Sequence, residues 1–162
     1  MTLDPTSAIR PATARDWAEI DPLLRARALP TDGAREHQAG FLVAADGSSV
    51  TGCIGLERYG SVGLLRSLAV TEQSSGRGVG TALVRALLTR ARAMGIETLY
   101  LLTTTAADYF PRFGFEPVPR TALPASLSAS EELRGACPAS AVAMRLTLPG
   151  QEVVGARGGS SA

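Results

Sequence analysis

A β-rich apolar run, a glycine-rich loop and an amphipathic helical pattern follow one another between residues 62 and 95. The run VGLLRSLAV predicts a strand, and the stretch SSGRGVG begins a few residues later. Small or apolar residues then recur at helical spacing, at Gly80, Leu83, Val84, Leu87, Leu88, Ala91 and Met94. Gly95 is typical of the residue that follows a helix end. The sequence therefore predicts a strand, a loop and a helix, with the loop built largely from glycine.

Three interpretations of this loop compete. A dinucleotide-binding fingerprint needs G-x-G-x-x-G, but Thr81 stands where its third glycine belongs. That interpretation fails on spacing. A tight strand-to-helix turn explains the glycines without any ligand. The third interpretation is an anion cradle, and we keep it beside the second.

An anion cradle has a physical basis in these residues. Gly76, Gly78 and Gly80 lack a Cβ, so the backbone can approach a ligand closely. The unpaired N–H groups of the first helical turn point outward at the positive end of the helix dipole. Arg77 adds a charged fork of donors inside the loop. A diphosphate is the expected ligand.

The rest of the chain predicts an α/β fold with a mixed sheet. Residues 7–13 predict a strand, and residues 13–30 a helix opened by Thr13 and interrupted by Pro22. Further strands are expected in the runs FLVAADG, VTGCIGLERY, IETLYLLTT and SAVAMRLTL, and a short helix in TAADYFPRFGF. We expect one domain over residues 1–148, one helical turn within the connection at residues 131–134, and a flexible tail over 149–162.

Two hairpins set the register of the first strands. Asp46-Gly47 and Gly60-Ser61 are typical hairpin turns, and the second fits type II′. A two-residue turn at Gly60-Ser61 pairs Tyr59 with Val62, which brings Glu57 and Arg66 onto the same face. Glu57 is then either a general base or the partner of Arg66 in an ion pair.

Composition narrows the function classes. The 162 residues carry a net charge of +1, which gives no sign of nucleic-acid binding, and no apolar run is long enough to cross a membrane. The first twenty residues lack a signal-peptide core, so a cytoplasmic location is expected. Cys53 and Cys137 lie far apart without metal-type spacing, and we interpret them as structural thiols without a metal. All 16 basic residues are arginine, which excludes a P-loop lysine and a lysine Schiff base.

Two ordered signatures resemble the GCN5-related N-acetyltransferases. LAVTEQSSGRGVGTALV resembles the family's motif A, whose Q/R-x-x-G-x-G/A loop binds the pyrophosphate of acetyl-CoA, with Ser75 in place of the usual glutamine or arginine. YFPRFGFEPV resembles the second signature, a short helix that ends at Gly-Phe beside the thiol of the cofactor. Further segments resemble the arsenic-resistance N-acetyltransferases, and the stretch from Thr103 resembles the C-terminal domain of amino-acid (glutamate) N-acetyltransferases.

The resemblance implies a fold, a cosubstrate and a set of residues. The fold is a mixed, mostly antiparallel central sheet flanked by helices, and acetyl-CoA is the cosubstrate, with no metal. The implied acetyl-CoA residues are the loop and the strand before it, whose backbone N–H groups bind the thioester oxygen: Leu68, Ala69, Val70, Ser75, Gly76, Arg77, Gly78, Val79, Gly80 and Thr81.

The implied general acid is a tyrosine four residues before the glycine of Gly-Phe, but Phe110 stands there and Tyr109 precedes it. One residue turns a helix by about 100°, so Tyr109 is either the acid or a packing residue. Solvent is the alternative proton source. Thr103, Thr104 and Thr105 end a strand where they either bond the pantetheine amides or simply close the strand.

The acceptor is expected to be a small amine with an anionic group, such as an amino acid, because Arg66 is a lone charge in an apolar strand. His37, the only histidine, is a second candidate base or an exposed loop residue. The leading interpretation is thus an N-acetyltransferase for small acceptors, with a role in arsenic or xenobiotic resistance, acting as a monomer or homodimer. The alternatives are a protein N-acetyltransferase and a non-catalytic acyl-CoA sensor.

Overall fold

The computed structural model describes residues 7–130 and 140–149. Its strands form one seven-stranded sheet in the order β1-β2-β3-β4-β5-β7-β6. The strands are β1 (Ser7–Pro11), β2 (Leu42–Asp46), β3 (Ser49–Tyr59), β4 (Val62–Val70), β5 (Thr98–Thr103), β6 (Glu116–Val118) and β7 (Val142–Thr147). Every described neighbouring pair is antiparallel except β4 and β5, which run parallel. The predicted mixed, mostly antiparallel sheet is confirmed.

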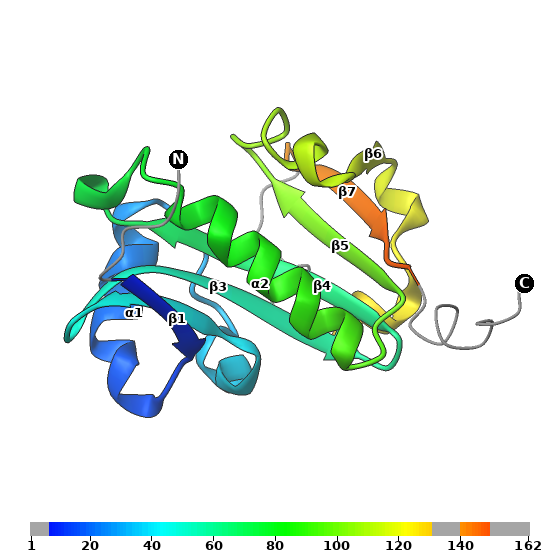
Figure 1. Ribbon diagram of the computed structural model, residues 1–162. Coiled ribbons are helices and arrows are strands. Elements are labelled where there is room, and N and C mark those ends of the chain that lie inside the picture. The colour runs from blue at the N-terminus through cyan, green and yellow to red at the C-terminus, as the bar shows by residue number, and fades with distance from the viewer. Residues whose placement is uncertain (1–6, 131–139, 150–162) are drawn as a thin grey trace, which may run out of the picture.

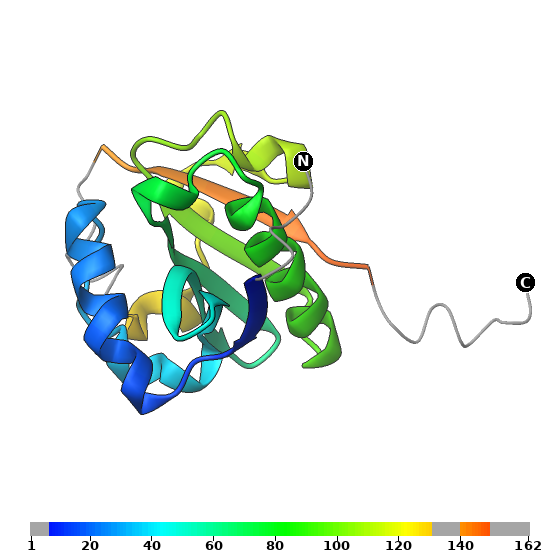
Figure 2. The same ribbon diagram turned by 60° about the vertical axis from the view of Figure 1, so that its left-hand side comes forward.

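Two α-helices cover opposite faces of the sheet (Figures 1 and 2). They are α1 (Trp17–Ala26) and α2 (Val79–Ala93). Short 3-10 turns are η1 (Ala14–Asp16), η2 (Arg35–Gly40), η3 (Glu72–Ser74), η4 (Phe110–Phe113), η5 (Arg120–Ala122) and η6 (Ala125–Ala129). No helix in the described part of the chain is long and apolar enough to cross a membrane.

Each helix buries the side that its apolar pattern predicts. Leu83, Val84, Leu87 and Ala91 of α2 are fully buried against one face of the sheet. Trp17, Ile20 and Leu24 of α1 pack on the opposite face around Phe41 and Cys53. Burying such side chains stabilises a fold by about 1.5–3 kcal/mol each. The two cores therefore hold the sheet between the helices.

The predicted hairpin register is confirmed. Tyr59 pairs with Val62, Glu57 with Leu64 and Gly55 with Arg66. Gly60 has a φ of +67°, and Ser61 is not among the residues with positive φ, which is the pattern of a type II′ turn.

β4 and β5 separate beyond their first residues. Their pairing covers only Val62–Leu64 with Thr98–Tyr100, although β4 continues to Val70 and β5 to Thr103. Figure 1 shows the two strands diverging toward their C-terminal ends. A bulge interrupts β4 in its separated part: the register with β3 shifts by one residue, and Ser67 adopts a left-handed φ of +63°.

The structure differs from the sequence-based expectations in three elements. Pro22 does not interrupt α1: it is exposed, and the buried side continues through Leu23 and Leu24. The short helix expected before Pro111 is a turn followed by η4, with Pro111 in its first positions rather than at its end. β6 contains Pro117 and was not predicted.

Two expectations fall outside the described residues. They are the helical turn at residues 131–134 and all but the first residue of the tail at 149–162. The domain boundary at residue 148 stays a prediction.

Candidate functional site

The glycine loop leads directly into α2, as expected. Gly76 and Gly78 have φ values of +79° and +83°, a region that disfavours residues with a side chain. Gly78 is the N-cap, and the N–H of Ala82 makes the first intrahelical bond to its carbonyl. The N–H groups of Val79, Gly80 and Thr81 precede that bond, so they are the orphan donors of the helix start.

A cavity of about 550 Å³, here called the loop cavity, lies against these donors. Its lining is Arg27, Leu68, Val70, Ser74, Ser75, Gly76, Gly78, Val79, Gly80, Thr81, Tyr109 and Arg112. A Cβ added at Gly76 would meet nothing within 4 Å, so the loop backbone faces open space. Backbone donors at a helix N-terminus make this cavity suited to a diphosphate, and Arg27 and Arg112 add positive charge to its lining.

Most of the predicted acetyl-CoA residues line this cavity, but two do not. Ala69 is 3% exposed and packs in the core beneath α1. Arg77 is exposed on the loop and is not part of the lining. Strand alternation explains why Ala69 differs from its neighbours, because successive side chains point to opposite faces.

The backbone of β4 presents donors to the side where β5 is missing. The N–H of Thr71 bonds the Thr51 carbonyl on β3. Since N–H groups alternate in direction along a strand, those of Val70 and Leu68 point away from β3, toward the opening. Of the three residues predicted to bind the oxyanion, Leu68 and Val70 are thus the two whose N–H groups point toward the opening.

A second cavity, of about 110 Å³, occupies the opening itself and is here called the inter-strand cavity. Its lining is Leu29, Pro30, Leu65, Arg66, Ser67, Leu68, Leu101, Leu102, Thr103, Thr105, Ala106 and Phe110. Leu68 lines both cavities, so they meet at this residue. Thr103 and Thr105 place hydroxyl groups along the β5 side, where an extended chain with amide groups could bond them.

Tyr109 and Phe110 face different cavities. Phe110 is 5% exposed and lines the inter-strand cavity, whereas Tyr109 lines the loop cavity. The Tyr109 hydroxyl lies 2.9 Å from Thr81 Oγ1 in the first turn of α2. The one-residue offset seen in the sequence therefore turns Tyr109 toward the helix N-terminus.

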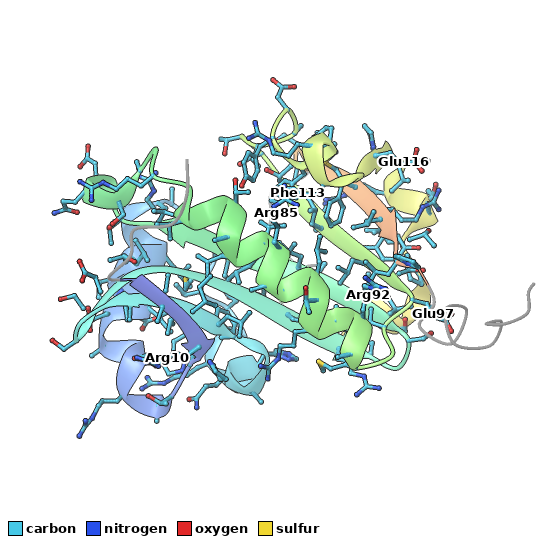
Figure 3. The ribbon with its side chains drawn as sticks, viewed as in Figure 1. Arg10, Arg85, Arg92, Glu97, Phe113 and Glu116 are labelled. Carbon is cyan, nitrogen blue, oxygen red and sulfur yellow. The ribbon has the colours of Figure 1, made fainter. Side chains whose placement is uncertain are left out.

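The segment that carries Tyr109 is held by aromatic and cationic contacts. The Arg112 guanidinium lies 4.4 Å from the centre of the Tyr109 ring. Arg85 of α2 lies over the ring of Phe113, at 5.6 Å from its centre, and Figure 3 shows the two side chains together. The contact between Arg85 and Phe113 joins η4 to α2, and that between Arg112 and Tyr109 lies within the segment itself.

Glu57 and Arg66 form a buried ion pair, the arrangement that the hairpin register predicts. Arg66 Nη1 donates to Glu57 Oε2 at 2.7 Å, and both side chains are 0% exposed. Arg66 also donates through Nε to Ser67 Oγ at 3.0 Å and through Nη2 to the Pro30 carbonyl at 3.2 Å. Glu57 accepts a further short hydrogen bond from the Tyr59 hydroxyl.

These contacts shift the pKa values of Glu57 and Tyr59. Burial raises the pKa of Glu57, but hydrogen bonds from Tyr59, Arg66 and Ser130 lower it by more, so its pKa lies below the usual value. Burial and the bond to Glu57 raise the pKa of Tyr59 to about 12. Glu57 is consequently a stable carboxylate and a weaker base than a free one.

His37 lies beside Glu57, and Cys53 lies beside Ser67. His37 Nε2 lies 3.6 Å from Glu57 Oε1, and its side chain is 31% exposed. Burial raises the pKa of Cys53 to about 12, and its thiol donates to the Ser67 carbonyl at 3.3 Å. Cys53 thus has the environment of a structural thiol, and Cys137 lies outside the described residues.

Several lining residues were not predicted. Arg112 lies inside the second signature, three residues after Tyr109, and its charge in that motif could have indicated a residue of the cavity lining. The end of α1 contributes Arg27, Leu29 and Pro30 to the cavities. It is far from the glycine loop in the sequence, and no local pattern predicts that these residues line a cavity. Over the described ranges, no group of three metal-ligating side chains is found.

Known proteins share both the fold and part of the sequence. The amino-acid acetyltransferase of Pseudomonas fluorescens is 44% identical over 64 residues, which are 40% of this chain and 15% of that protein. The amino-acid acetyltransferase of Neisseria meningitidis is 28% identical over 90 residues, 54% of this chain and 21% of that protein. The chain thus spans less than a quarter of these relatives.

Solved structures match most of the described fold. N-acetylglutamate synthase from Neisseria gonorrhoeae, complexed with coenzyme A and N-acetyl-glutamate, superposes with a TM-score of 0.77 at 22% identity, over 90% of this chain and 36% of that chain. Rv2747 from Mycobacterium tuberculosis, in complex with CoA, gives a TM-score of 0.74 at 24% identity, over 88% and 99%.

The Acetyltransferase (GNAT) family profile matches residues 7–115, from β1 to the Gly-Phe pair of the second signature. Enzymes of this family are N-acetyltransferases that use acetyl-CoA, in agreement with the predicted class and cosubstrate. The match covers more than half of the sequence and includes the glycine loop, Tyr109 and the parallel β4–β5 pair. The chain belongs to the Acetyltransferase (GNAT) family.

Proposed function

We propose that this protein transfers the acetyl group of acetyl-CoA to the amine of a small, amino-acid-like acceptor. The observation that carries the proposal is the junction of the two cavities at Leu68. One cavity has the donors for a diphosphate, and the other is a narrow opening between strands. A molecule with a diphosphate at one end and an extended arm at the other fits this shape.

The loop cavity would hold the diphosphate. Ser75, Gly76, Gly78, Val79, Gly80 and Thr81 line it, and Arg77 adds positive charge on the same loop. The pantetheine arm would run from the diphosphate along the loop cavity past Val70 to Leu68, so that the thioester lies where the inter-strand cavity, lined by Thr103 and Thr105, begins. Acetyl-CoA supplies the reactive thioester.

The residues around Leu68 would promote the transfer. The acceptor nitrogen forms a bond to the acetyl carbon, the bond from that carbon to sulfur breaks, one proton leaves the amine and one reaches the sulfur. The N–H groups of Leu68 and Val70 point to the opening, where they would bind the developing oxyanion. Such donors contribute about 3–4 kcal/mol to lowering a barrier.

The proton-transfer residues stay predictions. To act as the general base, Glu57 must accept a proton from the amine. Its carboxylate already accepts hydrogen bonds from Arg66 and Tyr59. Tyr109 as general acid requires its hydroxyl to reach the sulfur rather than Thr81. Phe110, at the place where the family usually has a tyrosine, offers no proton, which favours solvent as the donor.

The acceptor class rests on the amino-acid acetyltransferase relatives and on the neighbour complexed with N-acetyl-glutamate. The arsenic-resistance assignment is a narrower form of the same proposal, because it also requires an acceptor with an amine and an oxyanion. It rests only on the resemblance of short segments. The cytoplasmic location and the monomeric or dimeric state are proposals of the same kind.

Release of free thiol from acetyl-CoA in the presence of single amino acids tests the proposal. We expect at least one amino acid to raise thiol release tenfold or more above the rate without acceptor, and mass spectrometry to find its N-acetyl derivative. Tight CoA binding without thiol release would favour an acyl-CoA sensor. Release with peptides but not with free amino acids would favour a protein N-acetyltransferase.

A further inference from the structure

The end of α1 brings a cation to the point where the two cavities meet. Arg27 is the C-cap of α1 and lines the loop cavity with Leu68. Two and three residues later, Leu29 and Pro30 line the inter-strand cavity, again with Leu68. The segment 27–30 therefore borders the place where the acetyl carbon and the acceptor amine must meet.

This segment has a fixed course. Ala28 adopts a left-handed φ of +58°, which is uncommon for a residue with a side chain. The Pro30 carbonyl accepts a hydrogen bond from Arg66 Nη2, and the N–H of Leu29 donates to the Leu24 carbonyl. The position of Arg27 beside the cavity is thus set by neighbours on both sides.

The charges at the junction differ in how far they are already balanced. The guanidinium of Arg66 is fully buried and paired with Glu57, so its charge is compensated within the protein. Arg27 is exposed, and in the described part of the chain its guanidinium has no hydrogen-bond or ion-pair partner. An anionic acceptor therefore gains more from Arg27 than from Arg66.

We propose that Arg27 binds the α-carboxylate of the amino-acid acceptor and so determines the preference for amino acids over uncharged amines. The inference rests on the proposed function. The α-amine and the α-carboxylate share one carbon, so a cation beside the thioester position is close to both groups. The planar fork of arginine matches two carboxylate oxygens.

A structural role makes a different prediction. A cation at a helix C-terminus stabilises the helix by about 0.3–1 kcal/mol through the helix dipole. That role affects unfolding and leaves the choice of acceptor unchanged. Arg25, which is also exposed in the last turn of α1 but lies outside both cavities, is the matched control.

The test compares the best amino-acid acceptor with its α-amide at saturating acetyl-CoA. We expect Arg27→Gln to lower kcat/KM for the amino acid tenfold or more and to change it less than threefold for the amide. Arg27→Lys should retain part of the preference, and Arg25→Gln should behave as the unmodified protein. The ratio between the two substrates removes effects that they share, such as partial unfolding.

Three results would overturn the inference. The amino acid and the amide could lose activity equally, or the preference could survive in Arg27→Gln and disappear in Arg66→Met. Calorimetry could also show weaker CoA binding with an unchanged preference, which would assign Arg27 to the cofactor phosphates. If the unmodified protein releases no thiol with any amino acid, the proposed function itself fails and the inference falls with it.

Discussion

The Tyr109 hydroxyl and Thr81 Oγ1 lie 2.9 Å apart, and their contact joins the second signature to the first turn of α2. Both residues line the loop cavity, Thr81 from the first turn of α2 and Tyr109 from the residue before η4. The tyrosine expected to serve the thiol end of the cofactor is thus bonded near its diphosphate end. This relationship gives the first prediction.

Tyr109→Phe removes the hydroxyl and keeps the ring beneath Arg112. We expect kcat to fall less than threefold and the Kd for CoA to rise about two- to tenfold, the range for one neutral hydrogen bond. Steady-state kinetics and calorimetry measure the two quantities. Thr81→Val removes the other partner and should give a similar change in Kd. A hundredfold fall in kcat would instead identify Tyr109 as the general acid.

Gly78→Val places a branched side chain at a φ of +83° beside the loop cavity. We expect CoA affinity to fall more than tenfold, because the loop must change shape and the new side chain occupies space beside the helix donors. Gly47→Val is the control, since Gly47 has a φ of +65° in the β2–β3 turn and does not line the cavity. It should lose stability but keep CoA affinity. Unchanged affinity in a folded Gly78→Val protein would disprove the anion cradle.

Arg66→Met removes one partner of a fully buried ion pair. The free energy of unfolding should fall by about 3–5 kcal/mol, because Glu57 is left charged and unpaired in the core. Replacing Glu57 by Gln in the same protein should restore part of this loss. Arg145→Met is the control, since Arg145 is 38% exposed and lies 4.0 Å from Glu116, and it should cost less than about 1 kcal/mol.

The same Arg66 variant tests the acceptor prediction made from the sequence. With a purely structural role, the acceptor KM stays within threefold in whatever fraction is folded. A tenfold higher KM with unchanged CoA affinity would show that Arg66 binds the acceptor after all. Arg66→Lys, which preserves the charge, provides a more stable protein for this measurement.

Acid stability should depend on Asp16. The bidentate bond from Arg10, at 2.8 and 2.9 Å, outweighs burial and lowers the pKa of Asp16 to about 2. A depressed folded-state pKa contributes stability that is present above the unfolded pKa of about 4 and is lost as pH falls from 4 to 2. Because Arg10 is 44% exposed and the pair is screened, we expect this contribution to be about 1 kcal/mol.

Denaturant titrations at several pH values measure this effect. The stability difference between the unmodified protein and Arg10→Gln should be largest near neutral pH, should fall steeply between pH 4 and pH 2, and should disappear below the folded-state pKa of Asp16, which is about 2. A difference that stays constant across this range would assign the effect of Arg10 to packing rather than to Asp16.

Local patterns predicted the elements that position the cofactor loop. The period of Leu83, Val84 and Leu87 identified α2, and the Gly60-Ser61 turn fixed the register that unites Glu57 with Arg66. Both depend on residues that are close in the sequence. Short-range rules therefore suffice for the loop, the helix and the ion pair.

Other parts of the site depend on contacts between distant segments. The bulge at Ser67 contains no glycine that would predict it. β6 contains Pro117, a residue that normally argues against a strand but is tolerated at the edge of a sheet. Arg27 reaches the cavity only because α1 packs across the sheet. Hydrophobic periodicity identifies such a helix but not which polar residue at its end meets a cavity.

Because β4 and β5 pair over only three residues each, the sheet has an opening between these two central strands. Within residues 7–130 and 140–149, the backbone groups of Leu65–Val70 that face the opening have no strand to pair with, and we expect their amide protons to exchange with solvent. An extended ligand arm in the opening would act as the missing piece of backbone between the two strands. Hydrogen exchange should then slow at Leu68 and Val70 on CoA binding and stay unchanged at Ala69, whose N–H faces β3, making the amide protons of β4 a direct record of occupancy.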